Sequence, residues 1–203
     1  MFVLIQKGGP VMWPLLLTSL TALTVVIERC FFIIGEKKRR DEKAVENVLN
    51  LVEKGEIQKA IEHNKASNDF VARTLVYGLI HREKAFSNAL LQAANSELKR
   101  FTQGLPILDT IITLAPLLGL LGTVTGMIRA FGLLGQKELE APTVITGGIA
   151  EALIATAFGL GIAILALIPF NYLNARLEEA RHEIEDASTH LELILRKPDR
   201  RLT

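Results

Sequence analysis

The chain has 203 residues, of which 49% are hydrophobic and 22% are charged, and its formal net charge is +1. The mean hydropathy of +0.30 is high for a soluble domain, and the charges alternate with long uncharged runs, which indicates an integral membrane protein. A net charge near zero argues against a nucleic-acid partner, because neutralising phosphates requires a concentrated basic surface.

Three segments are long enough to span a bilayer, because a membrane helix needs about 20 mostly apolar residues. The first belongs to the segment 1–35 and starts near Pro10. Basic residues follow this apolar run and do not precede it, so we interpret it as a membrane helix and not as a cleaved signal peptide. Near its end, the adjacent Glu28 and Arg29 are predicted to form a local or intersubunit ion pair.

The distribution of basic residues predicts the topology. The run EKKRRDEK at 36–43 follows the first span and places its inner end in the cytoplasm by the positive-inside rule. Further basic residues lie on the cytoplasmic side of the second and third spans: Lys99, Arg100, Arg176 and Arg181. We therefore predict three spans with the N-terminus outside and the C-terminus inside.

Residues 36–104, between the first and second spans, form a cytoplasmic segment with helical periodicity. Four apolar positions near its start lie on one face of a helix: Val45, Val48, Leu49 and Val52. Gly55 interrupts this pattern, and two further apolar patterns follow. We predict a cytoplasmic domain of short helices packed against one another.

The second span, 105–134, has polar residues and glycines on neighbouring faces. At 3.6 residues per turn, five of its residues fall within about a quarter-turn and form a broken polar stripe: Asp109, Thr113, Pro116, Leu120 and Thr123. The first two of these would lie at the cytoplasmic mouth of a channel. Beside the stripe, three glycines allow close approach of another helix: Gly119, Gly122 and Gly126.

The third span, 143–173, follows an external loop at 135–142 and contains the acid Glu151. A charge near the bilayer centre costs about 2.5–3.5 kcal/mol on insertion scales, so such residues usually face a pore, a bundle interior or a partner. The same helix has a face of small residues suited to helix packing, with one threonine among them: Gly148, Ala152, Thr156, Gly159 and Ala163.

Counting from the turn between the second and third spans predicts which residues share a depth in the membrane. With this turn near 138–140, Thr123 and Thr156 lie at similar depth, and Glu151 lies opposite Arg129. Glu151 therefore either lines a cavity with the two threonines or forms an ion pair with Arg129. Each threonine hydroxyl could instead bond to the carbonyl four residues back in its own helix.

The segment 174–203 continues the third helix with an amphipathic pattern. Apolar residues alternate there at three- and four-residue steps: Leu173, Leu177, Ala180, Ile184, Ala187, Leu191 and Ile194. Pro198 predicts the end of this helix. The apolar stripe packs either against the neighbouring cytoplasmic helices or against copies of itself, and the sequence is compatible with both.

Two long motifs resemble the MotA/TolQ/ExbB family of proton-channel proteins, in its three-span ExbB and TolQ branch. They are GLLGTVTGMIRAF at 119–131 and GGIAEALIATAFGLGIAILALIP at 147–169, and MWPLL with the triplet IER at 27–29 is a weaker match. The likeness covers all three spans in order, whereas the cytoplasmic segment matches in placement and helical character only. It assigns no role to Arg129.

The resemblance implies an energy-transducing motor of the bacterial inner (cytoplasmic) membrane. Family members form a ring-shaped homo-oligomer, a pentamer, around a dimer of single-span ExbD- or TolR-like proteins whose membrane aspartate takes up and releases the proton. Thr123, Glu151 and Thr156 match the residues that line the channel opposite that aspartate. Threonine suits this place because its hydroxyl both donates and accepts hydrogen bonds. A TonB- or TolA-like protein would be a further partner.

No catalytic motif supports an enzyme: the chain lacks HExxH and GxSxG, and its glycine-rich run at 119–126 lacks the lysine of a phosphate-binding loop. The lone Cys30, and four histidines without metal-ligand spacing, predict no metal site. We expect no cofactor, with protons as the transported ion. The alternative to a channel is a non-conducting membrane scaffold, in which the polar intramembrane residues only pack helices.

Overall fold

The computed structural model describes residues 8–132 and 141–196, and the regular elements in these ranges are α-helices. Three helical stretches are long and apolar enough to cross a membrane: Met12–Arg39, Ala85–Gly132 and Thr146–Arg196. The predicted all-α fold with three membrane-spanning helices is thereby confirmed. Most of the predicted loop at 135–142, and the predicted helix end at Pro198, lie outside the described residues.

The chain divides into two compact units. The first comprises Met1–Arg29 and Gly104–Tyr172, and the second comprises Cys30–Gln103 and Leu173–Thr203. Two helices contribute residues to both units, because α2 runs over Met12–Arg39 and α8 over Ala141–Arg196.

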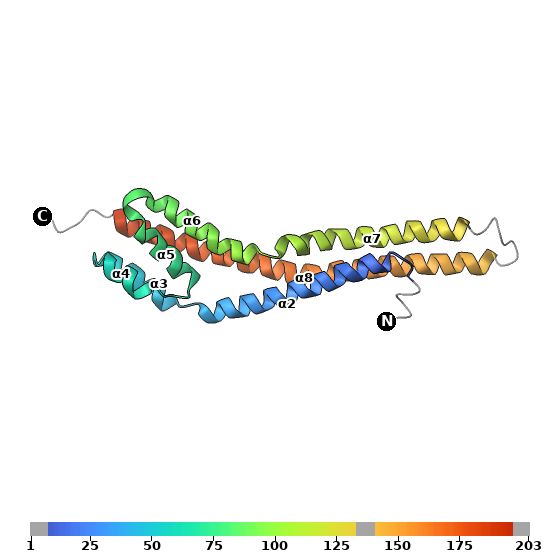
Figure 1. Ribbon diagram of the computed structural model, residues 1–203, viewed down its shortest axis with the longest axis horizontal. Helices are drawn as coiled ribbons and strands as arrows, with labels where there is room; N and C mark the ends of the chain where they lie inside the picture. The colour runs from blue at the N-terminus through green and yellow to red at the C-terminus, as the bar shows by residue number, and fades with distance from the viewer. Residues whose placement is uncertain (1–7, 133–140, 197–203) are drawn as a thin grey trace. The chain divides into compact units, whose positions relative to one another are not determined.

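The first unit consists of the N-terminal part of α2, the helix α7 (Leu105–Gly132) and the N-terminal part of α8. In this unit α7 runs antiparallel to α8, and α2 runs in the same direction as α8 (Figure 1). These relative directions are those of a chain that crosses a membrane three times. A turn at Gly104, with φ +83°, precedes α7, and this left-handed backbone conformation favours glycine.

The buried residues of α7 recur at three- and four-residue steps, which places them on one stripe of the helix: Leu105, Leu108, Ile111, Ala115, Gly119, Gly122, Gly126 and Ala130. Large apolar side chains cover the opposite face and are exposed in the single chain, among them Leu117, Leu120 and Ile128. An exposed apolar face of this extent suits contact with lipid tails or with further membrane helices.

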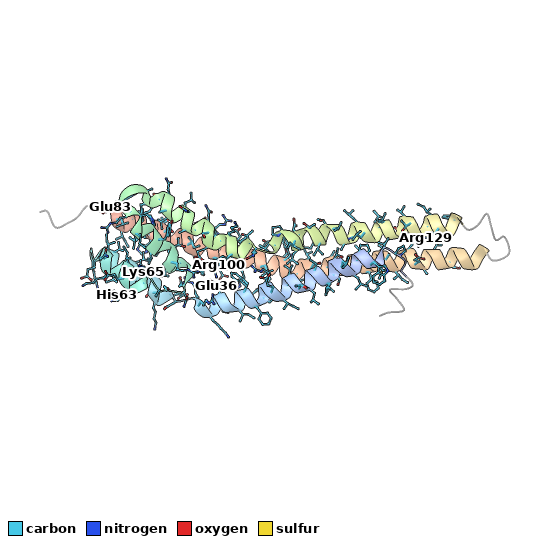
Figure 2. The ribbon with its side chains drawn as sticks, viewed as in Figure 1. Glu36, His63, Lys65, Glu83, Arg100 and Arg129 are labelled. Carbon is cyan, nitrogen blue, oxygen red and sulfur yellow. The ribbon has the colours of Figure 1, made fainter. Side chains whose placement is uncertain are left out.

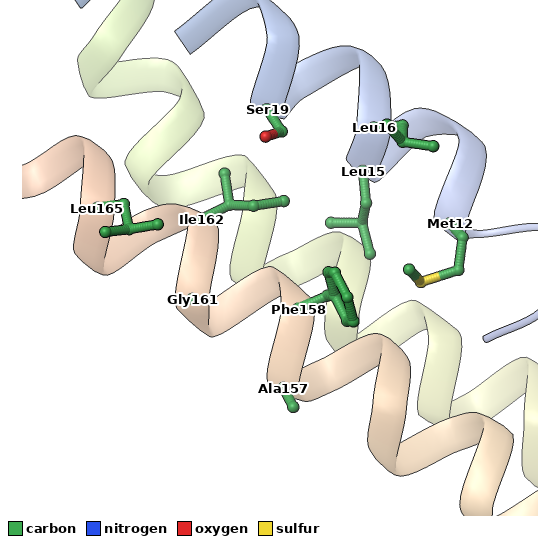
Figure 3. Close-up of a pocket in the computed structure, with 9 residues that line it drawn as sticks. All are labelled: Met12, Leu15, Leu16, Ser19, Ala157, Phe158, Gly161, Ile162 and Leu165. Carbon is green, nitrogen blue, oxygen red and sulfur yellow. The ribbon is translucent and has the colours of Figure 1, made fainter. Parts of the chain in front are cut away.

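An apolar groove of about 410 Å³ runs between α2 and α8 in the first unit. Figure 3 shows Met12 and Leu15 on the α2 side and Phe158 and Ile162 on the α8 side pointing toward it. Ser19 supplies the one hydroxyl of the lining. The lining of this groove is therefore mostly apolar.

The second unit contains four shorter helices together with the C-terminal parts of α2 and α8: α3 (Glu42–Glu53), α4 (Ile57–Asn64), α5 (Phe70–Ile80) and α6 (Arg82–Thr102). Asp41 and Asp69 cap α3 and α5, because their side chains accept hydrogen bonds from the first backbone amides of those helices. Five residues of the amphipathic stripe on α8 are buried within this chain: Leu173, Leu177, Ala180, Ile184 and Leu191. Of the two alternatives for the stripe, packing against the chain's own helices is therefore the one observed.

Asp69, in the second unit, is 0% exposed and accepts four hydrogen bonds through its carboxylate. Its Oδ1 accepts hydrogen bonds from the amides of Val71 and Ala72, each at 2.9 Å. Its Oδ2 accepts from the amide of Asp41 at 2.7 Å and from the guanidinium of Arg40. One carboxylate therefore caps α5 and holds the segment between α2 and α3.

Arg40 also donates from Nε to Glu183 Oε2 at 2.7 Å, which ties α8 to the same cluster. Burial lowers the pKa of the Arg40 guanidinium, but the hydrogen bonds and charges of Asp69 and Glu183 outweigh this effect and leave the pKa raised. Arg40 therefore stays charged over the whole physiological pH range.

A second group of charges surrounds the buried Glu36. Figure 2 labels two of its members, Glu36 and Arg100. Its Oε2 lies 3.5 Å from Arg100 Nη2, and its Oε1 lies 3.9 Å from Arg73 Nη2. Glu97 bridges the same two arginines, with Oε2 at 2.7 Å from Arg73 and 2.8 Å from Arg100. The end of α2 is thus joined to α5 and α6 by alternating charges.

Candidate functional site

Two of the polar residues singled out in the membrane spans, Thr156 and Glu151, lie at the contact between α7 and α8, which is built from small residues. A Cβ atom added at Gly126 would lie 3.0 Å from Ala152 Cβ, and one at Gly159 would lie 2.5 Å from the carbonyl oxygen of Ala115. A Cβ atom at Gly122 would overlap Ala155. Because several of the opposing atoms are backbone, the two helices are as close as their main chains permit.

All six residues assigned from the sequence to helix packing take part in this contact: Gly119, Gly122, Gly126, Gly148, Ala152 and Gly159. Gly148 meets Ala130 and the carbonyl oxygen of Gly126. We call this contact the glycine seam.

Thr156 lies at the glycine seam and links its two helices. Its hydroxyl donates a hydrogen bond to the carbonyl oxygen of Gly119 at 2.9 Å. A Cβ atom at Gly119 would lie 3.0 Å from Thr156 Cα, so the two residues are directly opposed. For Thr156 the alternative, a bond to the carbonyl four residues back in its own helix, is wrong, because the hydroxyl bonds across the helix pair.

Thr123 is half-buried, and its hydroxyl donates to the carbonyl oxygen of Leu120 in its own helix at 2.6 Å. The prediction that Thr123 and Thr156 lie at the same depth is off by about one helical turn. Thr156 is opposite Gly119, which precedes Thr123 by about one turn of α7. The physical reason is the interlocking of glycines, which sets the helix register independently of the length of the intervening loop.

Glu151 lies on α8 with its side chain 29% exposed, and its Oε1 is 3.3 Å from Arg129 Nη1 on α7. Arg129, labelled in Figure 2, is 54% exposed. The structure thus brings these two residues together as their predicted depths required.

A third element, which the sequence had not indicated, also contacts Glu151. The turn before α2 passes so close that a Cβ atom at Gly9 would lie 2.9 Å from Glu151 Cδ and closer still to Oε1. Gly9 also has a φ of +73°. The tripeptide Gly8–Gly9–Pro10 is a recognisable turn signal, but only the folded chain shows that this turn meets Glu151.

The remaining predicted site residues lie apart from this cluster. Asp109 is exposed on α7, and Thr113 donates to the carbonyl oxygens of Asp109 and Thr110. Glu28 and Arg29 form an ion pair on α2, in which Arg29 is buried and Glu28 is exposed. Among the described residues, no three His, Cys, Asp or Glu side chains are grouped closely enough to hold a metal ion.

Comparison with known proteins gives a consistent result. A sequence model of the MotA/TolQ/ExbB proton channel family matches residues 57–186, which is more than half of the chain. The matched region includes α7 and the part of α8 that forms the glycine seam, but it does not include α2.

Similar proteins extend the match to nearly the whole chain. One, named ExbB-like 1, from Synechocystis sp., is 38% identical over 198 residues, covering 94% of this chain and 77% of the relative. Another from the same organism, named ExbB-like 3, is 33% identical and covers 95% of this chain and 93% of the relative. The biopolymer transport protein ExbB of Pseudomonas putida is 30% identical, covering 91% of this chain and 59% of its own length.

The family unites channel-associated motor subunits of the inner membrane, and three membrane-spanning helices agree with that location. Its ExbB and TolQ members support a proton-channel type of energy-transducing role. On the strength of the family match and of these relatives, the chain belongs to the MotA/TolQ/ExbB proton channel family.

Proposed function

We propose that this chain is the proton-channel subunit of a motor that couples proton motive force to work at the cell envelope through a single-span ExbD/TolR-like partner. The observation that supports this most is the placement of polar groups along the glycine seam. Thr123, Thr156 and the Glu151–Arg129 pair are all partly exposed in the single chain. Exposed charges in a membrane span require a covering of protein or water.

A ring of subunits around a partner would supply that covering. We propose a homo-oligomer, a pentamer, that encloses a dimer of ExbD/TolR-like helices, with the N-terminus of each subunit outside and the C-terminus in the cytoplasm. The names of relatives, biopolymer transport protein ExbB and Tol-Pal system protein TolQ, are consistent with a TonB- or TolA-like protein as a further partner.

In this proposal Thr123, Glu151 and Thr156 line the proton path, and Asp109 and Thr113 lie at its cytoplasmic mouth. The hydroxyl of Thr156 already donates to Gly119, so its two lone pairs can accept a hydrogen bond from a protonated acid or a water molecule. Protons are the transported ion, and the proposal requires no cofactor.

The test is proton flux into vesicles that contain the chain co-expressed with its ExbD/TolR-like partner. We expect Thr156→Val to lower the flux by about fivefold or more, because a lost hydrogen bond costs about 1–3 kcal/mol and about 1.4 kcal/mol corresponds to a factor of ten. Thr156→Ser keeps the hydroxyl and should retain most of the flux.

Thr21→Val is the matched control, because the Thr21 hydroxyl on α2 donates to Leu17 in its own helix. It should leave the flux unchanged. Wild-type flux in both Thr156→Val and Glu151→Gln would contradict the proposed lining of the path.

The alternative of a non-conducting scaffold is supported by a specific observation. Thr123, Thr156 and Glu151 each have a bonding partner within the single chain. Polar residues that serve only to pack helices need no bonding partner outside the chain. The same flux measurement separates the two functions, because a scaffold predicts no partner-dependent proton flux in the wild-type protein.

A further inference from the structure

Among the described residues of the first unit, the turn that precedes α2 touches the Glu151 carboxylate and has no part in the proposed function so far. Met12 N donates to the carbonyl oxygen of Gly9 at 3.1 Å, which fixes this turn to the first residue of α2. Gly8 is buried, and a Cβ atom there would lie 3.3 Å from Ile154 Cγ2 on α8. The turn is therefore hydrogen-bonded to the start of α2 and packed against α8.

The space around the Glu151 carboxylate is limited by this turn. Arg129 Nη1 on α7 lies 3.3 Å from Oε1. The Gly9 backbone lies next to the same oxygen, so that a side chain at position 9 would displace it. Glycine meets two demands here, since it tolerates the positive φ and leaves room for the carboxylate. A rotamer of Glu151 that swung toward the turn would collide with it.

From this geometry we propose that Gly9 is a positioning residue for Glu151, and that the turn at residues 8–10 holds the carboxylate against Arg129. The relevance of this to proton movement rests on the proposed function of Glu151, but the positioning itself does not. A consequence is that α2, which contributes no residue to the proposed proton path, is coupled to it through its N-terminal turn.

The first test is a thermal double-mutant cycle on the full chain in detergent. Gly9→Ala should lower the Tm of the wild-type protein more than it lowers the Tm of Glu151→Ala, because the truncated side chain no longer collides with the added Cβ. Backbone strain at φ +73° lowers the Tm equally in the wild-type and Glu151→Ala backgrounds, so it cancels when the two decreases in Tm are compared. Equal losses in the two backgrounds would overturn the inference.

The second test measures how readily Glu151 reacts with a hydrophobic carbodiimide, in membranes that contain this chain without a partner. The Arg129→Gln variant gives the reference labelling rate of Glu151 without the neighbouring guanidinium. We expect Gly9→Ala to raise the rate severalfold, toward the Arg129→Gln value. Gly147→Ala is the control, because it is the same change one turn before Glu151 in a position with no neighbour within 4 Å.

Gly9→Asn covers the case in which Gly9→Ala does not fold, since asparagine tolerates positive φ while still adding a Cβ. It should raise labelling as well. An unchanged labelling rate in a folded Gly9 variant overturns the positioning role, whatever the flux. Raised labelling together with wild-type flux would support the positioning role and contradict the proposed function of Glu151.

Discussion

Asp69→Ala is expected to lower the free energy of unfolding of the second unit by about 3–5 kcal/mol, because several hydrogen bonds to a buried carboxylate are lost and each contributes about 1.5–3 kcal/mol. The wild-type carboxylate is fully buried and accepts from three backbone amides and from Arg40. Its removal leaves the α5 N-terminus uncapped and deprives Arg40 of its buried counter-charge. Thermal unfolding in detergent and hydrogen exchange of the α5 amides would measure the loss.

Asp41→Ala is the matched control for this prediction. Asp41 also caps a helix, but it is exposed and its side chain accepts a single hydrogen bond, from the amide of Ala44 at 3.2 Å. Losing such a cap costs about 1 kcal/mol. If the two substitutions destabilised the protein equally, the hydrogen bonds around Asp69 would not be the main source of its effect.

Gly159→Ala is expected to separate α7 from α8 and to destabilise the first unit by about 1–3 kcal/mol, the typical cost of overpacking. The added methyl would lie 2.5 Å from the carbonyl oxygen of Ala115 and 3.1 Å from Gly119 Cα. Backbone atoms cannot rotate away as a side chain can, so the helices must move. The Thr156 hydrogen bond to Gly119 should lengthen with them, so we also expect reduced proton flux.

Gly161→Ala provides the comparison within the same helix, two residues further along. A Cβ atom at Gly161 has no neighbour within 4 Å, and alanine is the better helix former. Its Tm in detergent should equal or exceed that of the wild type, whereas the Tm of Gly159→Ala should fall. A fall of the same size in both variants would show that helix propensity, and not the glycine seam, governs the effect.

The amphipathic and small-residue patterns explain why much of the fold could be predicted. The spacing of Leu173, Leu177 and Ile184 requires a helix with one buried side, and those residues are buried in α8. The alternation of Gly119, Gly122 and Gly126 with larger residues likewise indicates a face for close packing, and this face meets α8. In both cases local periodicity determines which side of a helix is buried.

Contacts between distant segments could not be predicted in the same way. Asp69 is both a helix cap, which is local, and the counter-ion of Arg40, which lies 29 positions away in the sequence. The cap has a sequence signal, an aspartate directly before an apolar run. The ion pair has none, because it depends on how the second unit packs.

The sequence by itself determined that this protein has three apolar helices, which of their faces are small, and which few polar residues they contain, because these properties depend on composition and on the 3.6-residue period. Only the tertiary structure decided the register of the glycine seam, the bond from Thr156 to Gly119 and the contact of Gly9 with Glu151. Those features arise from the closest approach of separate helices, and their steric fit depends on displacements smaller than one helical turn.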